Sequence, residues 1–246
     1  MKFGLIGYPL SHSFSQNYFN EKFKQLGLDD FSYALLPIQS ETGFANLLRA
    51  DYFGLNVTIP HKSSILNFLN DIEPAALQIG AVNTIVRIGK FSWKGYNTDV
   101  LGFTESLLEW YGGESLPQHA LVLGSGGSSK AICFALQRLG INTSVVSSSG
   151  AGHYAYTDLT QDIIHQHLLL VNTTPLGMMP DESAYPSIPY EYLTPEHSVF
   201  DLIYNPANTL FLRQSENMGA KVKNGLDMLY KQAEHAWLIW KQHGKF

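Results

Sequence analysis

The strongest constraint on the fold is a glycine-rich turn between two apolar segments, in the stretch HALVLGSGGSSKAICFALQRLG at residues 119–140. The apolar run at 120–123 has the length of a strand and no polar alternation, which is typical of a strand buried on both faces of a parallel sheet. After the turn, apolar residues recur with helical spacing until Gly140, a residue type that commonly ends helices. Strand, glycine turn and helix form the first half of a βαβ unit, so we predict an α/β protein with a doubly wound, Rossmann-like unit.

The turn also has the chemistry of an anion site. Glycines leave the backbone bare, and the N–H groups and positive dipole at a helix start hold a phosphate. The residues predicted to contact a dinucleotide here are Gly124, Ser125, Gly126, Gly127 and Ser128. The usual fingerprint is G-x-G-x-x-G/A, whereas the third small residue here is Ser129. The alternative is a tight structural turn without a ligand.

Composition excludes several classes of function. The chain has 246 residues, enough for two modest domains, and a formal net charge of −5, which argues against a nucleic-acid partner. Its single cysteine, Cys133, excludes a disulfide within the chain. No signal peptide and no membrane-spanning apolar run is visible, so we expect a cytoplasmic protein. The histidines have no metal-ligand spacing, so no metal site is expected, and His12 is assigned to the surface.

Periodicity predicts a second α/β unit before the glycine turn. The expected strands there are 2–6, 33–38 and 54–59, the helices 16–26, 42–51 and 63–69, and a hairpin joins 81–86 to 91–96. A helix then starts near Thr98 and Asp99 and runs to 111, which places the domain junction near Thr98. In the nucleotide unit the further strands are 141–147, 168–171, 199–204 and 220–223. The helices there are 159–165, 210–217 and 225–243, and the connection at 148–167 is short for a doubly wound half.

Polar residues at predicted strand ends form a candidate site, because ligands of open parallel sheets bind beyond the carboxyl ends of the strands. Among them, Lys62 follows a buried strand and can act as an acid or base when a carboxylate such as Asp99 holds it in place. The alternatives are a solvated lysine and a simple helix cap. Ser13 and Ser15 have the same alternative, since serines commonly cap the helix that follows them.

Several ordered motifs together resemble the shikimate dehydrogenase family over essentially the whole chain. They are S-F-S at 13–15, N-V-T-I-P-H-K at 56–62, G-A-V-N-T at 80–84, G-Y-N-T-D at 95–99, G-S-G-G at 124–127, N-T-T-P-L-G-M at 172–178, D-L-I-Y-N-P at 201–206, and G-L-D-M-L at 225–229 with Gln232 and Ala233. A set of motifs in this order is far more specific than the glycine turn alone.

The resemblance implies a reversible NADP-dependent reduction of 3-dehydroshikimate to shikimate, in the pathway to chorismate and the aromatic amino acids. It assigns catalysis to Lys62 and Asp99, the substrate carboxylate to Ser13 and Ser15, and the carboxylate end of the site to Tyr204. The residues that would bind ring hydroxyls are Thr58, Asn83, Asp99 and Gln232. The further cofactor-binding residues would be Ser147, Ser148, Ser149, Thr173, Leu202 and Gly225.

The family layout also implies two domains whose cleft closes on the ligands. Residues 1–98 plus 226–246 would bind the substrate, and residues 99–225 would bind the dinucleotide. In this reading Lys62 and Asp99 meet over one small molecule in the interdomain gap. The partners implied are small molecules, with neither nucleic acid nor membrane, and the protein would be a monomer or a homodimer.

The sequence departs from the family at the position that grips the NADP 2′-phosphate. The family usually has Asn-Arg-Thr after the second nucleotide strand, and this chain has Ser147, Ser148 and Ser149. Serines donate hydrogen bonds to a phosphate but carry no charge, so we expect NADP with weak discrimination against NAD. The alternatives are a quinate/shikimate or aminoshikimate dehydrogenase that uses NAD, and a non-catalytic metabolite-binding protein of the same fold.

Overall fold

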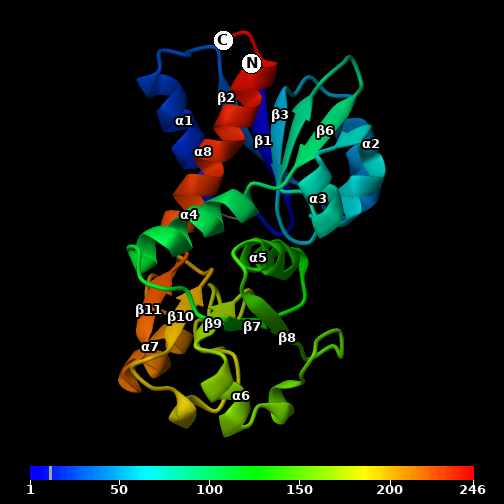
Figure 1. Cartoon of the computed structure of the whole chain (residues 1–246). Helices are drawn as coiled ribbons and strands as arrows, with labels where there is room; N and C mark the ends of the chain where they lie inside the picture. The colour runs from blue at the N-terminus through cyan, green and yellow to red at the C-terminus, as the bar shows by residue number, and fades with distance from the viewer. Residues whose placement is uncertain (11–12) are drawn as a thin grey trace. The chain divides into compact units, whose positions relative to one another are not determined.

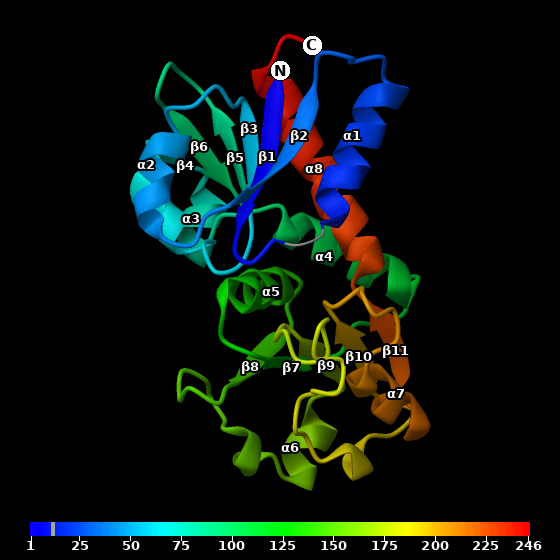
Figure 2. The same ribbon diagram turned by 180° about the vertical axis from the view of Figure 1, so that it is seen from behind.

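The computed structural model describes residues 1–10 and 13–246 and divides the chain into two compact units (Figures 1 and 2). His12 lies outside the described residues. The first unit consists of Met1–Thr98 and Ala233–Phe246, and the second of Asp99–Gln232. The chain thus returns to the first unit at Ala233, later than the expected residue 226, and Gln232 belongs to the second unit.

The first unit is built on a mixed six-stranded sheet in the order β2-β1-β3-β5-β6-β4. The strands are β1 (Lys2–Gly7), β2 (Ser32–Pro37), β3 (Gly54–Val57), β4 (Asp71–Ile72), β5 (Thr84–Arg87) and β6 (Trp93–Tyr96). Strands β1, β2 and β3 are parallel, and β5 runs antiparallel to both β3 and β6. The expected hairpin is therefore confirmed.

Helices cover both faces of this sheet. The helix α1 (Phe14–Gln25) and the C-terminal part of α8 (Leu226–His243) pack on one face, and the short helices α2 (Phe44–Leu47) and α3 (Pro74–Ile79) lie on the other (Figures 1 and 2). Trp240 of α8 is fully buried and donates from Nε1 to the carbonyl oxygen of Ile85 at 3.1 Å. It fits only because residue 54 is glycine, where an added Cβ would lie 2.4 Å from the indole nitrogen.

Three expectations in this unit were wrong or incomplete. The helix expected at 42–51 is instead a 3-10 turn, Glu41–Gly43, followed by the four-residue helix α2 and a turn in which Ala50 N–H donates to Asn46 O and Leu47 O. The helix expected at 63–69 is a 3-10 helix, Ser64–Phe68. Helix α3 was not predicted, although Pro74 begins it and Gly80, with φ of 69°, ends it.

The second unit has a five-stranded, all-parallel sheet in the order β11-β10-β9-β7-β8. The strands are β7 (His119–Leu123), β8 (Asn142–Val146), β9 (Leu169–Asn172), β10 (Ser198–Asp201) and β11 (Lys221–Asn224). Helices α4 (Asp99–Tyr111) and α5 (Gly127–Arg138) lie on one face, with α6 (Gln161–Gln166) and α7 (Leu210–Asn217) on the other (Figure 1). The doubly wound architecture is confirmed, and strand β10 ends earlier than expected, at Asp201.

One close helix contact shapes the second unit. The backbone of α4 at Gly102 approaches α8 so closely that an added Cβ would lie 2.8 Å from both Gln232 N and Met228 O.

In the part of the chain that the structure describes, no helix combines the length and the apolar character needed to cross a bilayer.

Candidate functional site

The carboxyl ends of β7, β8 and β9 meet at the glycine turn. Gly124 N–H donates to Val146 O at 2.8 Å, while the backbone N–H and hydroxyl of Thr173 both donate to Leu123 O, at 2.9 and 2.7 Å. Gly124 has a φ of +108°, and a Cβ there would lie 2.8 Å from Thr173 Oγ1. The first glycine is therefore required by the backbone conformation and by the close approach of β9.

The start of α5 is open to an anion. Gly126 is the N-cap, no side chain caps the helix, and no acidic residue lies in its first turn. A Cβ at Gly126 would meet no atom within 4 Å, so space for a ligand remains above the turn. Backbone N–H groups and the helix dipole at such a terminus match a pyrophosphate, so these residues fit a dinucleotide.

Three hydroxyls gather beside this turn. Ser125 Oγ lies 3.0 Å from Ser147 Oγ and 3.4 Å from Ser149 Oγ, and the last two are 2.8 Å apart. Ser147 is buried, whereas Ser148 and Ser149 are exposed. The structure brings these predicted residues together as a neutral cluster at the end of β8, and Ser148 has no hydrogen bond within it.

Two further predicted cofactor residues touch through the backbone. A Cβ on Gly225 would lie 2.1 Å from the carbonyl oxygen of Leu202. Gly225 N–H donates to Ile203 O at 3.0 Å, so the loop after β10 is bound to the end of β11. This glycine is present because no side chain fits.

A buried carboxyl that was not assigned to the site organises the same edge. Asp201 is fully buried and accepts from Asn172 Nδ2 at 2.9 Å, from the Thr209 hydroxyl at 2.6 Å and from Ile203 N–H at 3.1 Å. Burial raises the pKa of Asp201 to about 6, although these hydrogen bonds oppose the rise. Asn172 in turn accepts from Thr174, so Asp201 joins the loops that follow β9 and β10.

In the first unit, Lys62 lies in a turn soon after β3. Its carbonyl oxygen accepts from Val82 N–H at 2.7 Å. The neighbouring His61 is buried, with Nε2 2.5 Å from Ile38 O and its ring edge-on to Phe44 at 5.0 Å between centroids. The turn is thus fixed on two sides, and the Lys62 side chain itself is half-buried.

The two serines predicted to bind the carboxylate lie at the start of α1. Ser13 is the N-cap, and its Oγ accepts from Ser15 N–H at 3.1 Å, which uses the hydroxyl only as an acceptor. Ser13 therefore caps α1, which does not exclude donation to an anion, and its role toward a substrate stays a prediction. Thr58 lies between β3 and Lys62 and is half-buried.

Asn83 is held by several hydrogen bonds in the first unit. Its Oδ1 accepts from Thr98 N–H at 2.7 Å and from the hydroxyls of Thr84 and Thr98 at 3.1 and 3.2 Å. Its Nδ2 donates to Thr98 Oγ1 at 3.0 Å. These bonds fix the direction of the amide, with the nitrogen as its donor end.

The remaining predicted residues lie in the second unit. Asp99 is the first residue of α4 and is buried, with 6% of its surface exposed. Gln232 Nε2 donates to Leu229 O at 3.0 Å, and burial raises the pKa of Tyr204. The pairing of Asp99 with Lys62 stays a prediction.

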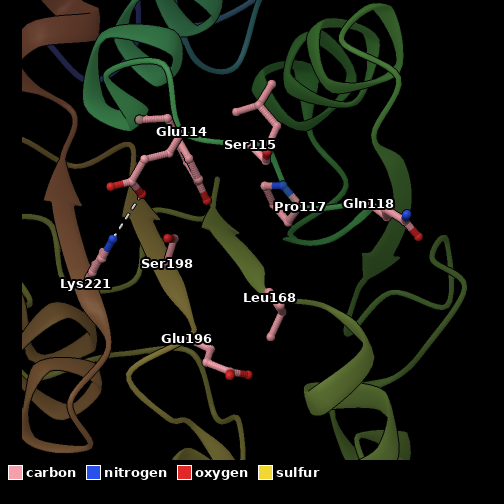
Figure 3. A pocket seen from close by; sticks show the side chains of 10 residues that line it. Glu114, Ser115, Pro117, Gln118, Leu168, Glu196, Ser198 and Lys221 are labelled. Atoms are coloured by element: carbon pink, nitrogen blue, oxygen red, sulfur yellow. Dashed lines mark hydrogen bonds and ion pairs between the residues drawn. The ribbon is translucent and has the colours of Figure 1, made fainter.

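A separate pocket of about 390 Å³ lies at the opposite edge of the second sheet, where β7, β9, β10 and β11 begin (Figure 3). Glu114, Glu196 and Lys221 line it, and Lys221 Nζ lies 3.2 Å from Glu114 Oε2. Both partners are mostly exposed, so the ion pair contributes little. None of the predicted site residues lines this pocket.

Among the described residues, no group of three or more His, Cys, Asp or Glu is arranged to hold a metal ion.

A parallel sheet whose glycine turn leads into an open helix start is typical of the dinucleotide-binding unit of two-unit dehydrogenases, and here a second α/β unit accompanies it. Residues 5–85 match the family model described as the shikimate dehydrogenase substrate binding domain. The chain is 37% identical to the shikimate dehydrogenase (NADP(+)) of Desulforamulus reducens, with 96% of this chain and 88% of that protein covered. The chain belongs to the shikimate dehydrogenase family.

Solved structures agree with this assignment. Shikimate 5-dehydrogenase from Thermus thermophilus, in complex with NADP(H) and shikimate, matches this chain with a TM-score of 0.86 and 33% sequence identity. The match covers 98% of this chain and 94% of the Thermus thermophilus chain. The enzyme from Listeria monocytogenes, in complex with shikimate and NAD, has a TM-score of 0.76 and 26% identity, with 98% and 91% covered. The two relatives thus carry different cofactors in the same fold.

Proposed function

We propose that this chain catalyses the reversible NADP-dependent reduction of 3-dehydroshikimate to shikimate, a step toward chorismate and the aromatic amino acids. The observation that carries the proposal is the likeness, over 98% of this chain, to the Thermus thermophilus enzyme with NADP(H) and shikimate. The open start of α5 and the fixed turn at Lys62 support it from this chain's own geometry.

In this proposal Lys62 moves the proton. As the carbonyl of 3-dehydroshikimate is reduced, negative charge develops on its oxygen, and the Lys62 ammonium stabilises that charge and donates a proton to it. Asp99 is the carboxylate partner that keeps the amine oriented. In the reverse direction Lys62 accepts the proton of the hydroxyl that is oxidised.

Other residues hold the substrate. Ser13 and Ser15 donate to its carboxylate, since several short donors can converge on one anion. Tyr204 lines that end of the substrate. The ring hydroxyls are bound by Thr58, Asn83, Asp99 and Gln232.

The cofactor residues lie on one edge of the second sheet. The glycine turn and the start of α5 bind the pyrophosphate, and we assign the cluster of Ser125, Ser147 and Ser149 to the adenosine ribose because it follows β8, the second strand of the unit. Thr173, Leu202 and Gly225 are assigned to the nicotinamide half. When bound, the nicotinamide supplies the hydride that reduces the carbonyl carbon.

The first test is removal of the amine. Lys62→Ala is expected to lower kcat for shikimate oxidation by about 10²- to 10⁴-fold, as is usual when a general acid–base group is lost. Shikimate binding measured by calorimetry should persist, because the serines and amides remain. The matched control is Lys90→Ala, which removes an exposed lysine on the hairpin and should leave kcat unchanged. Full turnover by Lys62→Ala would refute the role given to this lysine.

The second test asks whether Lys62 and Asp99 act as one unit. Asp99→Asn alone should also lower kcat, and the double variant Lys62→Ala/Asp99→Asn should lose little more than Lys62→Ala, because groups that act together are non-additive. Additive losses would show that the two side chains act separately.

A NAD-dependent quinate/shikimate or aminoshikimate dehydrogenase is the second candidate, favoured by the neutral serines and by the Listeria monocytogenes complex with NAD. Substrate profiling with both cofactors separates the two. Wild-type protein that binds shikimate without any turnover would instead identify a non-catalytic binding protein. We also propose that the protein is cytoplasmic. It is a monomer or a homodimer in this proposal, and light scattering of the purified protein tests the oligomeric state.

A further inference from the structure

A continuous chain of buried hydrogen bonds crosses the sheet of the first unit. Tyr33 on β2 donates its hydroxyl to Asn56 Oδ1 on β3 at 2.7 Å. Asn56 Nδ2 donates to Thr84 Oγ1 on β5 at 3.1 Å, and Thr84 donates to Asn83 Oδ1 at 3.1 Å. Tyr33, Asn56 and Thr84 are 2%, 6% and 0% exposed, and each uses its side chain in this chain of hydrogen bonds.

One end of this chain reaches a residue that the proposed function assigns to the substrate. Asn83 is bonded there to Thr98, the last residue of the first unit, which directly precedes Asp99 in the chain. One polar path therefore joins three strands and the segment after β6.

We propose that Tyr33, Asn56 and Thr84 are positioning residues that hold the Asn83 amide in a fixed orientation for substrate binding. The inference rests on the proposed function and extends it to three side chains that the family resemblance did not assign. Its physical basis is that buried polar groups cost free energy unless they are paired, so each member fixes the orientation of the next. A fixed orientation is useful where a small rigid ligand must meet a donor in one geometry.

The direction of the hydrogen bonds supports positioning rather than generic packing. The phenol gives its one hydrogen to Asn56, the Asn56 amide gives its hydrogens to Thr84 Oγ1 and Asn83 O, and Thr84 gives its hydrogen to Asn83 Oδ1. Asn83 is thereby left with its nitrogen as the donor end. Removal of the Thr84 hydroxyl, in the middle of the path, breaks the chain of hydrogen bonds and leaves every residue assigned to the substrate in place.

The experiment compares kinetic constants of variants in the path. Thr84→Val keeps the shape of the side chain and removes the hydroxyl, and Thr84→Ser restores it. Thr84→Val is expected to raise KM for shikimate about 3- to 10-fold, the net worth of one hydrogen bond, with kcat and the KM for NADP within about twofold of wild type. Thr84→Ser should return the shikimate KM to near the wild-type value.

Tyr33→Phe provides an independent variant if Thr84→Val does not fold. It keeps the ring stacked on Phe19, at 4.8 Å between centroids, and removes only the hydroxyl. The same rise in shikimate KM is expected. The matched control is Tyr190→Phe in the second unit, another buried phenol, which donates to Pro186 O at 2.7 Å and lies outside the path. It should lower thermal stability without changing the shikimate KM.

The outcomes separate the two proposals. If wild-type protein oxidises shikimate and the path variants lose only thermal stability, or if their KM values for shikimate and NADP rise together, the positioning role is refuted and the proposed function stands. If wild-type protein neither binds nor oxidises shikimate, the proposed function fails and the positioning role fails with it.

Discussion

At the scale of single residues, the most informative difference between this chain and the family pattern is a missing positive charge at residue 148. The position that usually carries arginine is Ser148, which is exposed and lies beside the hydroxyls of Ser147 and Ser149. Hydroxyl groups donate to a ribose hydroxyl and to a phosphate alike, whereas a guanidinium favours the doubly charged phosphate. The cofactor preference of the wild-type protein is therefore expected to be small.

Ser148→Arg should restore the missing charge. The ratio of kcat/KM for NADPH to that for NADH is expected to increase by roughly tenfold or more, since one charge-assisted bidentate contact contributes about 1.5–3 kcal/mol. The control is Ser148→Gln, which has a long polar side chain without charge and should leave the ratio nearly unchanged. If this kcat/KM ratio is the same in wild type and Ser148→Arg, the 2′-phosphate does not bind beside residue 148.

At the scale of elements, the sequence predicted the second unit better than the first. The strand at 119–123, α5 and α7 follow from apolar runs and glycine stops, and α7 has the predicted bounds. Helices α2 and α3 are too short to show a periodic pattern, and they depend on tertiary packing of Phe44 and Ala76 against the sheet. Tyr33 carries no signal in the sequence, because a buried phenol in a strand looks like any other core residue.

Gly225 provides a test at this scale, because it lies between β11 and α8 and contacts the loop after β10 too closely for a side chain to fit. Gly225→Ala places a Cβ against the Leu202 carbonyl, so the loop after β10 or the start of α8 must shift. We expect a loss of about 1–3 kcal/mol in the free energy of unfolding, measured by urea denaturation, together with a raised KM for NADP. Gly89→Ala is the control, since a Cβ there would meet only ordinary contacts from Ser92, at 3.4 Å or more. Wild-type stability of Gly225→Ala would contradict the close approach.

At the scale of the whole molecule, the buried carboxyl of Asp201 links stability to pH. Its pKa of about 6 lies above the ordinary 3.8, so the folded chain binds more protons than the unfolded chain between these values. The contribution of Asp201 to stability therefore increases as pH falls through that window and is smallest above it. Most paired carboxylates act in the opposite direction.

Asp201→Asn removes this titration. The free energy of unfolding of wild type minus that of the variant should increase by up to about 3 kcal/mol as pH is lowered from about 7 to about 4. Asp29→Asn changes an exposed carboxyl in the first unit and serves as the control. A difference between wild type and Asp201→Asn that does not vary with pH would show that Asp201 titrates normally.

The immobilised amide of Asn83 has a consequence for selectivity. Its oxygen already receives hydrogens from Thr84 and Thr98, so the side chain cannot rotate to offer that oxygen to a ligand. In the proposed function Asn83 binds a ring hydroxyl, and a ring substituent at this position must then bring a lone pair. A hydroxyl or carbonyl group does so, but a protonated amine has none to give, so aminated analogues of shikimate whose ammonium faces this position should be rejected before any chemistry begins.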